Sequence, residues 1–207
     1  MKKLIAILTC LGVMLFAGMA TALTIGFDEF NAETETVALG PDYEGFTWSS
    51  FYVISNTYFN NYFNREIEGN IDFPSMNNAV FNDYGVTNIS IEAPSGTFDF
   101  EGASFIALSR ANVVAPSTLT ITAYGINNTP IGSEMINLLL SEFTALSASY
   151  QEVVKLEFSW NTVEGQWLMD DFLDSTPNGE PGQPIPEPIT LLLLGIGLVG
   201  LGLASRK

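Results

Sequence analysis

The side chains of this chain that could do chemistry are almost all carboxylates. The sequence contains no histidine, and its single cysteine, Cys10, lies in an apolar run at the N-terminus. The region beyond that run therefore has no Ser-His-Asp triad, no thiol nucleophile and no zinc site built from His or Cys. Any metal there would be a hard cation held by oxygen atoms, calcium first. Any catalysis would use carboxylates, tyrosines, Lys155 or hydroxyl groups.

One group of carboxylates lies at the two ends of the central region, with Asp28 and Glu29 near its start and Asp170 and Asp171 near its end. These four residues approach one another if the first and last strands pair antiparallel. Close carboxylates repel unless they are protonated or bridged by a cation. These four residues are therefore candidate ligands for a structural calcium ion. The alternative is a set of solvated acids at strand ends, because their spacing is not that of an EF-hand loop.

A second group is the stretch from Tyr43 to Asn64, which is rich in aromatic and amide side chains. Flat aromatic rings can pack on the apolar C–H faces of sugars, and amides can hydrogen-bond sugar hydroxyls. The candidate ligand-binding residues are Trp48, Tyr52, Tyr58 and Tyr62. The alternative is that Phe46, Trp48 and Phe51 belong to a core strand. The tyrosines are the better candidates for exposure, because their hydroxyl groups tolerate water.

An enzyme built from these residues would be a glycoside hydrolase, which needs two carboxyl groups about 5–10 Å apart, one of them with a raised pKa. No acid cluster of the form E-x-D-x-x-E occurs. We therefore predict no catalytic residues, and keep a carboxylate-dependent glycosidase as the remote alternative.

The charge of the central region excludes another class of function. From Leu23 to Pro186 the sequence has 22 acidic residues and three basic ones, Arg65, Arg110 and Lys155, which gives a net charge of −19. Such a charge disfavours electrostatic binding of nucleic acid or anionic lipid.

Apolar and polar residues alternate with a period of two along 88–93, 98–101, 118–123 and 154–160. Such runs are typical of half-buried antiparallel strands, and short turn sequences rich in Pro, Gly and Asn separate them. The pattern predicts an all-β fold, an antiparallel β-sandwich or jelly roll in one domain over 23–173. Residues 133–148 could form a helix, or equally a strand and a turn. The composition of 174–185 indicates a disordered linker rich in Pro and Gly.

The N-terminal residues 1–22 have the pattern of a signal peptide. Lys2 and Lys3 precede an apolar run, and Ala20-Thr21-Ala22 supplies small residues at the two positions that signal peptidase reads. The mature chain is expected to begin at Leu23, with cleavage after Ala20 as the alternative.

The C-terminal residues 186–207 combine Pro186-Glu187-Pro188, the apolar run 189–204 and a basic end. As a transmembrane helix the run would rise about 24 Å, short of the usual 30 Å but within what local thinning of the bilayer allows. Arg206 and Lys207 are expected to stay in the cytoplasm, which leaves the body outside it.

These C-terminal residues resemble the PEP-CTERM sorting domain, a tail that exosortase-type membrane transpeptidases process in biofilm-forming Gram-negative bacteria. The resemblance implies signal peptidase and an exosortase-like transpeptidase as partners. It also implies anchoring in the inner membrane before processing, and the cell surface or extracellular matrix afterwards.

The body has a looser resemblance, carried by four short segments that begin at Ile25, Tyr43, Ser95 and Trp167: IGFDEF, YEGFTW, SGTFDF and WLMDDF. It is similar to the jelly-roll body common among PEP-CTERM proteins and akin to carbohydrate-binding modules. Together with the aromatic and amide-rich stretch and the sorting tail, it leads us to expect an exported, non-catalytic module that binds extracellular polysaccharide or associates with the extracellular matrix. The alternative is a structural or adhesive envelope protein without a defined ligand.

Overall fold

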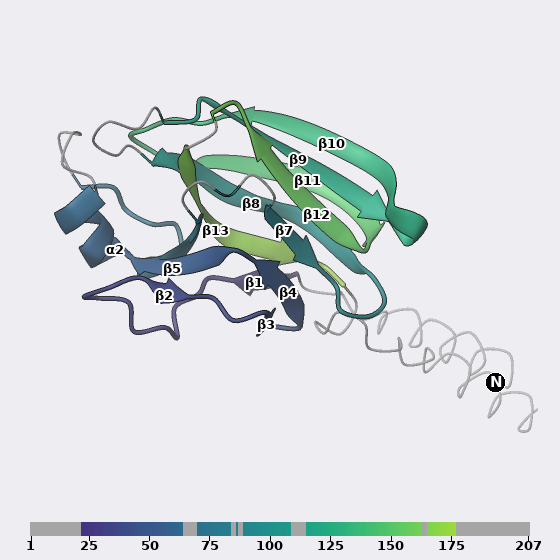
Figure 1. The fold of residues 1–207 in the computed structure, drawn as a ribbon, viewed down its shortest axis with the longest axis horizontal. Helices are drawn as coiled ribbons and strands as arrows, with labels where there is room; N and C mark the ends of the chain where they lie inside the picture. The colour runs from purple at the N-terminus through teal and green to yellow at the C-terminus, as the bar shows by residue number, and fades with distance from the viewer. Residues whose placement is uncertain are drawn as a thin grey trace, which may run out of the picture.

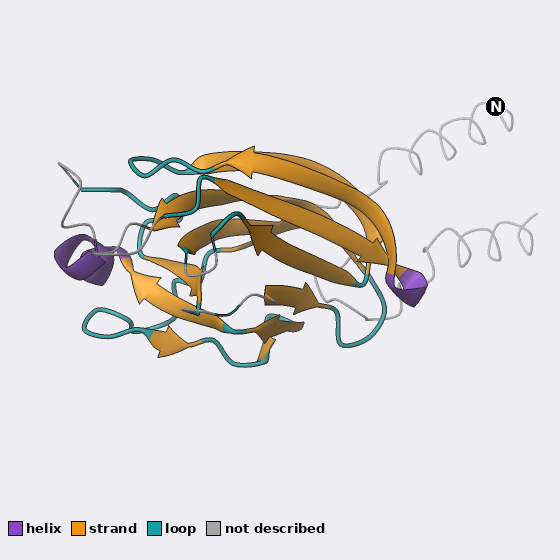
Figure 2. Cartoon of the chain, turned by 45° about the horizontal axis from the view of Figure 1, so that its top comes forward, coloured by secondary structure: helices purple, strands orange, loops and turns teal. Residues whose placement is uncertain are grey.

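The computed structural model describes residues 22–63, 70–83, 86, 89–108, 115–162 and 165–176. In these residues two antiparallel β-sheets pack face to face (Figures 1 and 2). The predicted all-β sandwich is therefore confirmed.

The first sheet contains both ends of the body. Its strands, in spatial order, are β11 (Thr144–Val153), β8 (Phe98–Leu108), β13 (Gln166–Asp174), β6 (Asn78–Asn82), β5 (Phe51–Ser55) and β2 (Val37–Ala38), and β1 (Leu23–Ile25) also pairs with β13. The first and last strands thus pair antiparallel, with Leu23 opposite Asp174 and Ile25 opposite Phe172.

The second sheet comes mainly from the middle of the chain. Its strands, in spatial order, are β10 (Thr129–Asn137), β9 (Thr118–Gly125), β12 (Lys155–Trp160), β7 (Ile89–Glu92), β4 (Phe46–Ser49) and β3 (Asp42–Tyr43). Short helical turns follow β5, as α2 (Asn56–Tyr58) and η1 (Phe59–Phe63), and join β9 to β10, as η2 (Ile126–Asn128). Residues 133–148 form a strand, a turn and a strand, which was the second of the two expected conformations.

The main core lies between the sheets and follows the two-residue period of the sequence. Inward-pointing side chains of both sheets are at most 3% exposed, among them Trp48, Phe98, Ile121, Leu156 and Phe158. Aromatic rings fill much of the space, and Phe158 contacts Trp167 with a ring separation of 5.2 Å.

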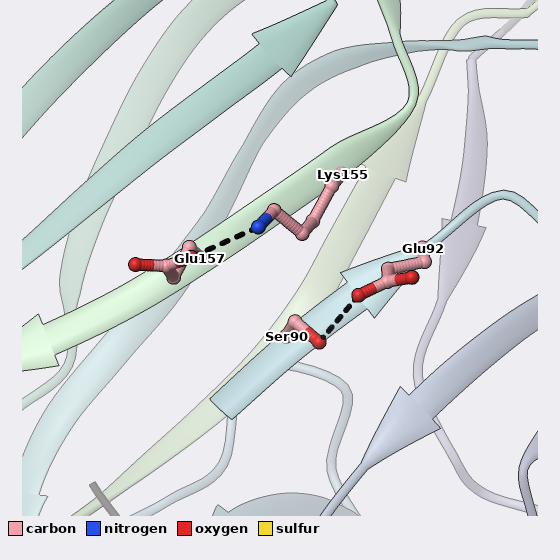
Figure 3. A network of polar contacts seen from close by, with 4 residues as sticks. All are labelled: Ser90, Glu92, Lys155 and Glu157. Carbon is pink, nitrogen blue, oxygen red and sulfur yellow. Dashed lines mark hydrogen bonds and ion pairs between the residues drawn. The ribbon is translucent and has the colours of Figure 1, made fainter. Parts of the chain in front are cut away.

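In the runs that form β7, β9 and β12, the polar side chains lie on the outer face of the second sheet. Lys155 and Glu157 form an ion pair of 3.0 Å along β12, and Ser90 donates a hydrogen bond to Glu92 along β7 (Figure 3). Both side chains of the pair keep contact with water, so the pair contributes little stability.

The outer face of the first sheet carries a second hydrophobic cluster. Residues that point away from the main core on β5, β6, β8 and β13 meet apolar side chains of the segment that follows β5: Ile54, Phe59, Ile71, Phe73, Ala79, Phe81, Ile106, Leu108 and Leu168. The amide of Asn60 fixes this covering segment, because it donates to the carbonyl of Ile71 and accepts from its N–H.

The body extends slightly beyond the boundary that the sequence indicates at residue 173. β13 ends at Asp174, Ser175 donates from its backbone to Asp99, and the Ser175 hydroxyl donates to Glu101 over 2.7 Å. The predicted signal peptide up to residue 21, the linker from 177 and the sorting tail lie outside the described residues. Within the described part of the chain, no helix is long and apolar enough to cross a membrane.

Candidate functional site

The loop that follows β1 carries the first two of the predicted acids, and one amide holds it in place. Asn78, at the start of β6, is 2% exposed and donates two hydrogen bonds of 2.9 Å, to the carbonyls of Phe27 and Phe30. Phe27 has a φ of 61°, and this left-handed conformation turns the chain sharply after β1. Asp28 accepts from the backbone N–H of Asn78 over 3.1 Å.

Asp170 lies beneath this loop in β13 and is fully buried. Its carboxylate accepts hydrogen bonds of 2.8 Å from the backbone N–H groups of Ser75 and Asp171. Burial nevertheless raises the pKa of Asp170 to about 7, because the two donors only partly compensate for lost hydration.

The predicted acids from the two ends of the body do meet. Burial raises the pKa of Asp171, and the negative charge of Asp28 raises it further. Ser75 links the two sides, because it donates from its backbone to Asp170 and its hydroxyl lies 3.5 Å from the carboxylate of Asp28. The fourth acid, Glu29, points toward β3, where burial and a hydrogen bond with Glu29 raise the pKa of Tyr43.

Several oxygen atoms gather around the Ser75 hydroxyl. It lies 3.1 Å from the carbonyl of Gly26 and 3.1 Å from the carbonyl of Asn78, besides its contact with Asp28. One hydroxyl proton can serve only one of these three acceptors at a time. The acceptor oxygen atoms of this cluster therefore outnumber the hydroxyl protons that could bridge them. In the described part of the chain, however, no three acidic side chains are arranged to hold a metal ion.

An open pocket of about 430 Å³ lies beside this oxygen cluster. It is formed by the loop after β1, the junction of β5 with α2, and the turn before β6. Its polar lining includes the hydroxyl residues Ser55 and Thr57, and three carboxylates and four amides, from Asp28, Glu29, Glu33, Asn31, Asn56, Asn77 and Asn78. We call it the acid–amide pocket. A smaller pocket of about 190 Å³ shares Asp28 and Glu29 with it and extends to Tyr43.

Trp48, Tyr52 and Tyr58 are not among the residues that line this pocket. Trp48 is 3% exposed and donates from its indole N–H to the carbonyl of Tyr43, so it belongs to the core and offers no ring to a ligand. Tyr52 is half-buried and packs on Phe81 at 5.7 Å, and Tyr58 is half-buried against the same cluster. The side chain of Tyr62 lies outside the described residues.

Sequence reasoning did not identify Ser75, Asn77 and Asn78 as site residues. They occupy a turn that lies far from Asp28 and Asp170 in the chain, and the sheet brings the three segments together. The available signal was the run Ser75-Met-Asn-Asn78, in which Met76 has a φ of 88°. Two consecutive amides at such a turn indicate side chains that bond neighbouring backbone.

The C-terminal residues 184–207 match the model of the PEP-CTERM protein-sorting motif. The chain therefore carries this motif. The motif implies an exported protein that is anchored in the membrane and then processed by an exosortase. No curated protein sequence matches the chain.

Solved structures match the body by shape. A DUF4465 family protein from Bacteroides caccae aligns with a TM-score of 0.55 and 10% identity, over 74% of this chain and 98% of that protein. This similarity shows a shared β-sandwich fold. Two further matches have lower scores. The CBM29-2 carbohydrate-binding module has a TM-score of 0.41 and 12% identity, over 82% of this chain and 100% of the module. The Clostridium thermocellum xylanase 10B fragment with CBM22-1 has a TM-score of 0.39 and 12% identity, over 75% of this chain and 28% of the fragment.

Proposed function

We propose that this exported protein is a non-catalytic carbohydrate-binding module of the cell envelope or extracellular matrix, and that the acid–amide pocket binds the glycan. The observation that carries the proposal is the lining of the pocket. The exposed amides of Asn31 and Asn77 can both donate and accept, and carboxylates accept in pairs, which suits the hydroxyl groups of a sugar. The volume of about 430 Å³ falls within the range of small-molecule sites.

The position of Asp170 supports binding without catalysis. It is the carboxyl group whose pKa, about 7, would suit a general acid at neutral pH. It is fully buried and does not line the acid–amide pocket, so a glycosidic oxygen bound there would not reach it.

Calcium would fit beside the pocket as a structural ion. The residues that would hold it are Asp28 and Asp170, through their carboxylates, and Gly26 and Asn78, through their carbonyls, since all four surround Ser75. A hard cation takes six to eight such oxygen ligands, including backbone carbonyls and water. Bound there, it would neutralise the carboxylates and join the loop after β1 to β13.

Affinity electrophoresis against neutral, acidic and amino polysaccharides tests the glycan proposal. Asn31→Ala and Asn77→Ala remove exposed amides from the pocket, and neither side chain hydrogen-bonds another residue within the described part of the chain. Asn137→Ala, an exposed amide on the edge strand β10, is the matched control. We expect the two pocket variants to lose retardation and the control to retain it.

Tyr52→Ala and Tyr58→Ala test whether the half-exposed tyrosines add a stacking surface, because Tyr58 directly follows the pocket residues Asn56 and Thr57. No retardation of the unaltered protein by any polysaccharide would favour a structural or adhesive envelope protein. Release of reducing sugar would favour a carboxylate-dependent glycosidase.

Thermal unfolding with and without a chelator tests the calcium proposal. Calcium should raise the melting temperature, because a ligand that binds only the folded state stabilises it by mass action. Replacing Asp28 and Asp170 together by Asn should abolish the increase. Replacing Glu35 and Glu142 by Gln removes the same charge from exposed sites and should not. An increase that survives the first double substitution would place the ion elsewhere.

A further inference from the structure

At the end of β13 lies a buried carboxylate with only one of its two oxygen atoms hydrogen-bonded among the described residues. Asp174 is fully buried. Its Oδ1 accepts hydrogen bonds from the backbone N–H groups of Asp99 (3.3 Å) and Thr176 (2.8 Å), and from the Thr176 hydroxyl. Its Oδ2 is buried without a hydrogen-bond partner among the described residues. Such an oxygen costs stability unless a donor or a cation meets it.

The residue opposite Asp174 is the expected first residue of the mature chain. Leu23 begins β1 and stands directly across from Asp174 in the antiparallel register. The Cα atoms of such a pair lie about 5 Å apart, with both side chains on the same face, so the backbone nitrogen of Leu23 is within reach of an aspartate side chain. Ala22, which precedes it, is exposed and outside the strand.

We propose that removal of the signal peptide completes this site. Hydrolysis of the Ala22–Leu23 peptide bond by signal peptidase consumes one water molecule. It leaves a carboxylate on Ala22 and an ammonium group on Leu23. The new ammonium group forms an ion pair with Oδ2 of Asp174, and this pair fastens β1 to β13. Processing thereby stabilises the body that it releases.

The position of Asp174 also distinguishes the two cleavage sites that the N-terminal sequence allows. Cleavage after Ala20 would leave Thr21 and Ala22 on the chain and move the ammonium group by two residues, about 7 Å along an extended segment. Only cleavage after Ala22 places the charge beside Asp174. The inference depends on signal-peptide removal and is independent of glycan or calcium binding.

Four versions of the mature chain up to Lys207, in detergent, test the pair. Two begin at Leu23 or at Ala22, made by a fusion protease that leaves no extra residue, and two add Asp174→Asn to these. The three tryptophans of the sequence all lie in the sandwich, so their fluorescence reports its thermal unfolding. Breaking a buried ion pair should lower the melting temperature of the chain that begins at Ala22 by roughly 5 °C or more.

In the Asp174→Asn background the two N-termini should give the same melting temperature. Equal melting temperatures without the substitution, or an equal difference in both backgrounds, would overturn the proposal. If Asp174→Asn does not fold, the reactivity of the N-terminal amine decides instead. A paired ammonium at Leu23 should react more slowly with an amine-directed reagent than the free one at Ala22, and equal rates would refute the pair.

Discussion

Ionisation of Asp170 should make the metal-free sandwich less stable as the pH rises. Burial raises the pKa of this carboxyl from 3.8 to about 7, against the two backbone donors that favour its charged form. Between these pH values the folded protein keeps a proton that the unfolded chain has lost, so the free energy of unfolding falls with rising pH. The contribution is fully present below about pH 4 and is lost once the pH exceeds about 7.

The magnitude follows from the size of the shift. Each unit of pKa difference corresponds to about 1.4 kcal/mol, so the full change is about 4 kcal/mol, and about 3 kcal/mol of it falls between pH 5 and pH 8. Because Asp170 is fully buried, solvent does not screen this effect. Burial and the charge of Asp28 also raise the pKa of Asp171, which adds a loss in the same direction.

Urea unfolding in chelator at several pH values from 5 to 8, followed by tryptophan fluorescence, measures the effect. Asp170→Asn isolates this effect, because the amide does not titrate. The hydrogen bond that is lost on substitution lowers the free energy of unfolding by the same amount at every pH. The free energy of unfolding of the unaltered protein, minus that of the variant, should fall by about 3 kcal/mol over this range. A difference that stays constant from pH 5 to pH 8 would show that Asp170 is not the buried, protonated group described here.

Three further predictions concern the core, a glycine and the sorting tail. Phe158→Ala should lower the free energy of unfolding by about 3–5 kcal/mol because its ring is fully buried, whereas Glu157→Ala beside it should lower it by less than about 1 kcal/mol. Equal losses in urea unfolding would contradict the inward and outward alternation along β12. Gly102→Ala should lower the free energy of unfolding by about 2 kcal/mol or more, since Gly102 has a φ of 144° and a Cβ there would overlap the carbonyl oxygen of Leu146. An unchanged unfolding midpoint would refute the close approach of β8 to β11. Replacing Pro186, Glu187 and Pro188 by alanine should leave the unfolding midpoint unchanged but alter the distribution between membrane and exterior in a host with an exosortase. An unaltered distribution would show that the motif does not direct sorting.

The sequence by itself determined the features that depend on neighbouring residues. Alternation of period two marked which side of β9 and β12 is buried, because successive side chains of a strand point to opposite faces. The same period explains why Phe158 is buried while Glu157 is exposed. The sorting motif also needs no fold to be recognised, since it is a linear signal at 184–207.

The sequence also predicted part of the site, through one topological assumption. Pairing of the first and last strands brings Asp28 close to Asp170 and Asp171, as β1 and β13 show. The aromatic stretch was harder to interpret, because an aromatic ring suits a core and a sugar surface equally well. The burial of Trp48 depends on Phe27, Phe51 and Phe172, which come from three different strands or loops.

Only the tertiary structure decided the contents of the site. Ser75 and Asn78 meet Asp28 and Asp170 across separations of about 50 and 95 residues in the chain, and no local pattern encodes such contacts. The burial that raises the pKa of Asp170 likewise comes from the packing of distant segments, since its sequence neighbours alone would leave it solvated. Periodicity reports which face of a strand is apolar, whereas the pairing of strands determines which polar groups share a buried space.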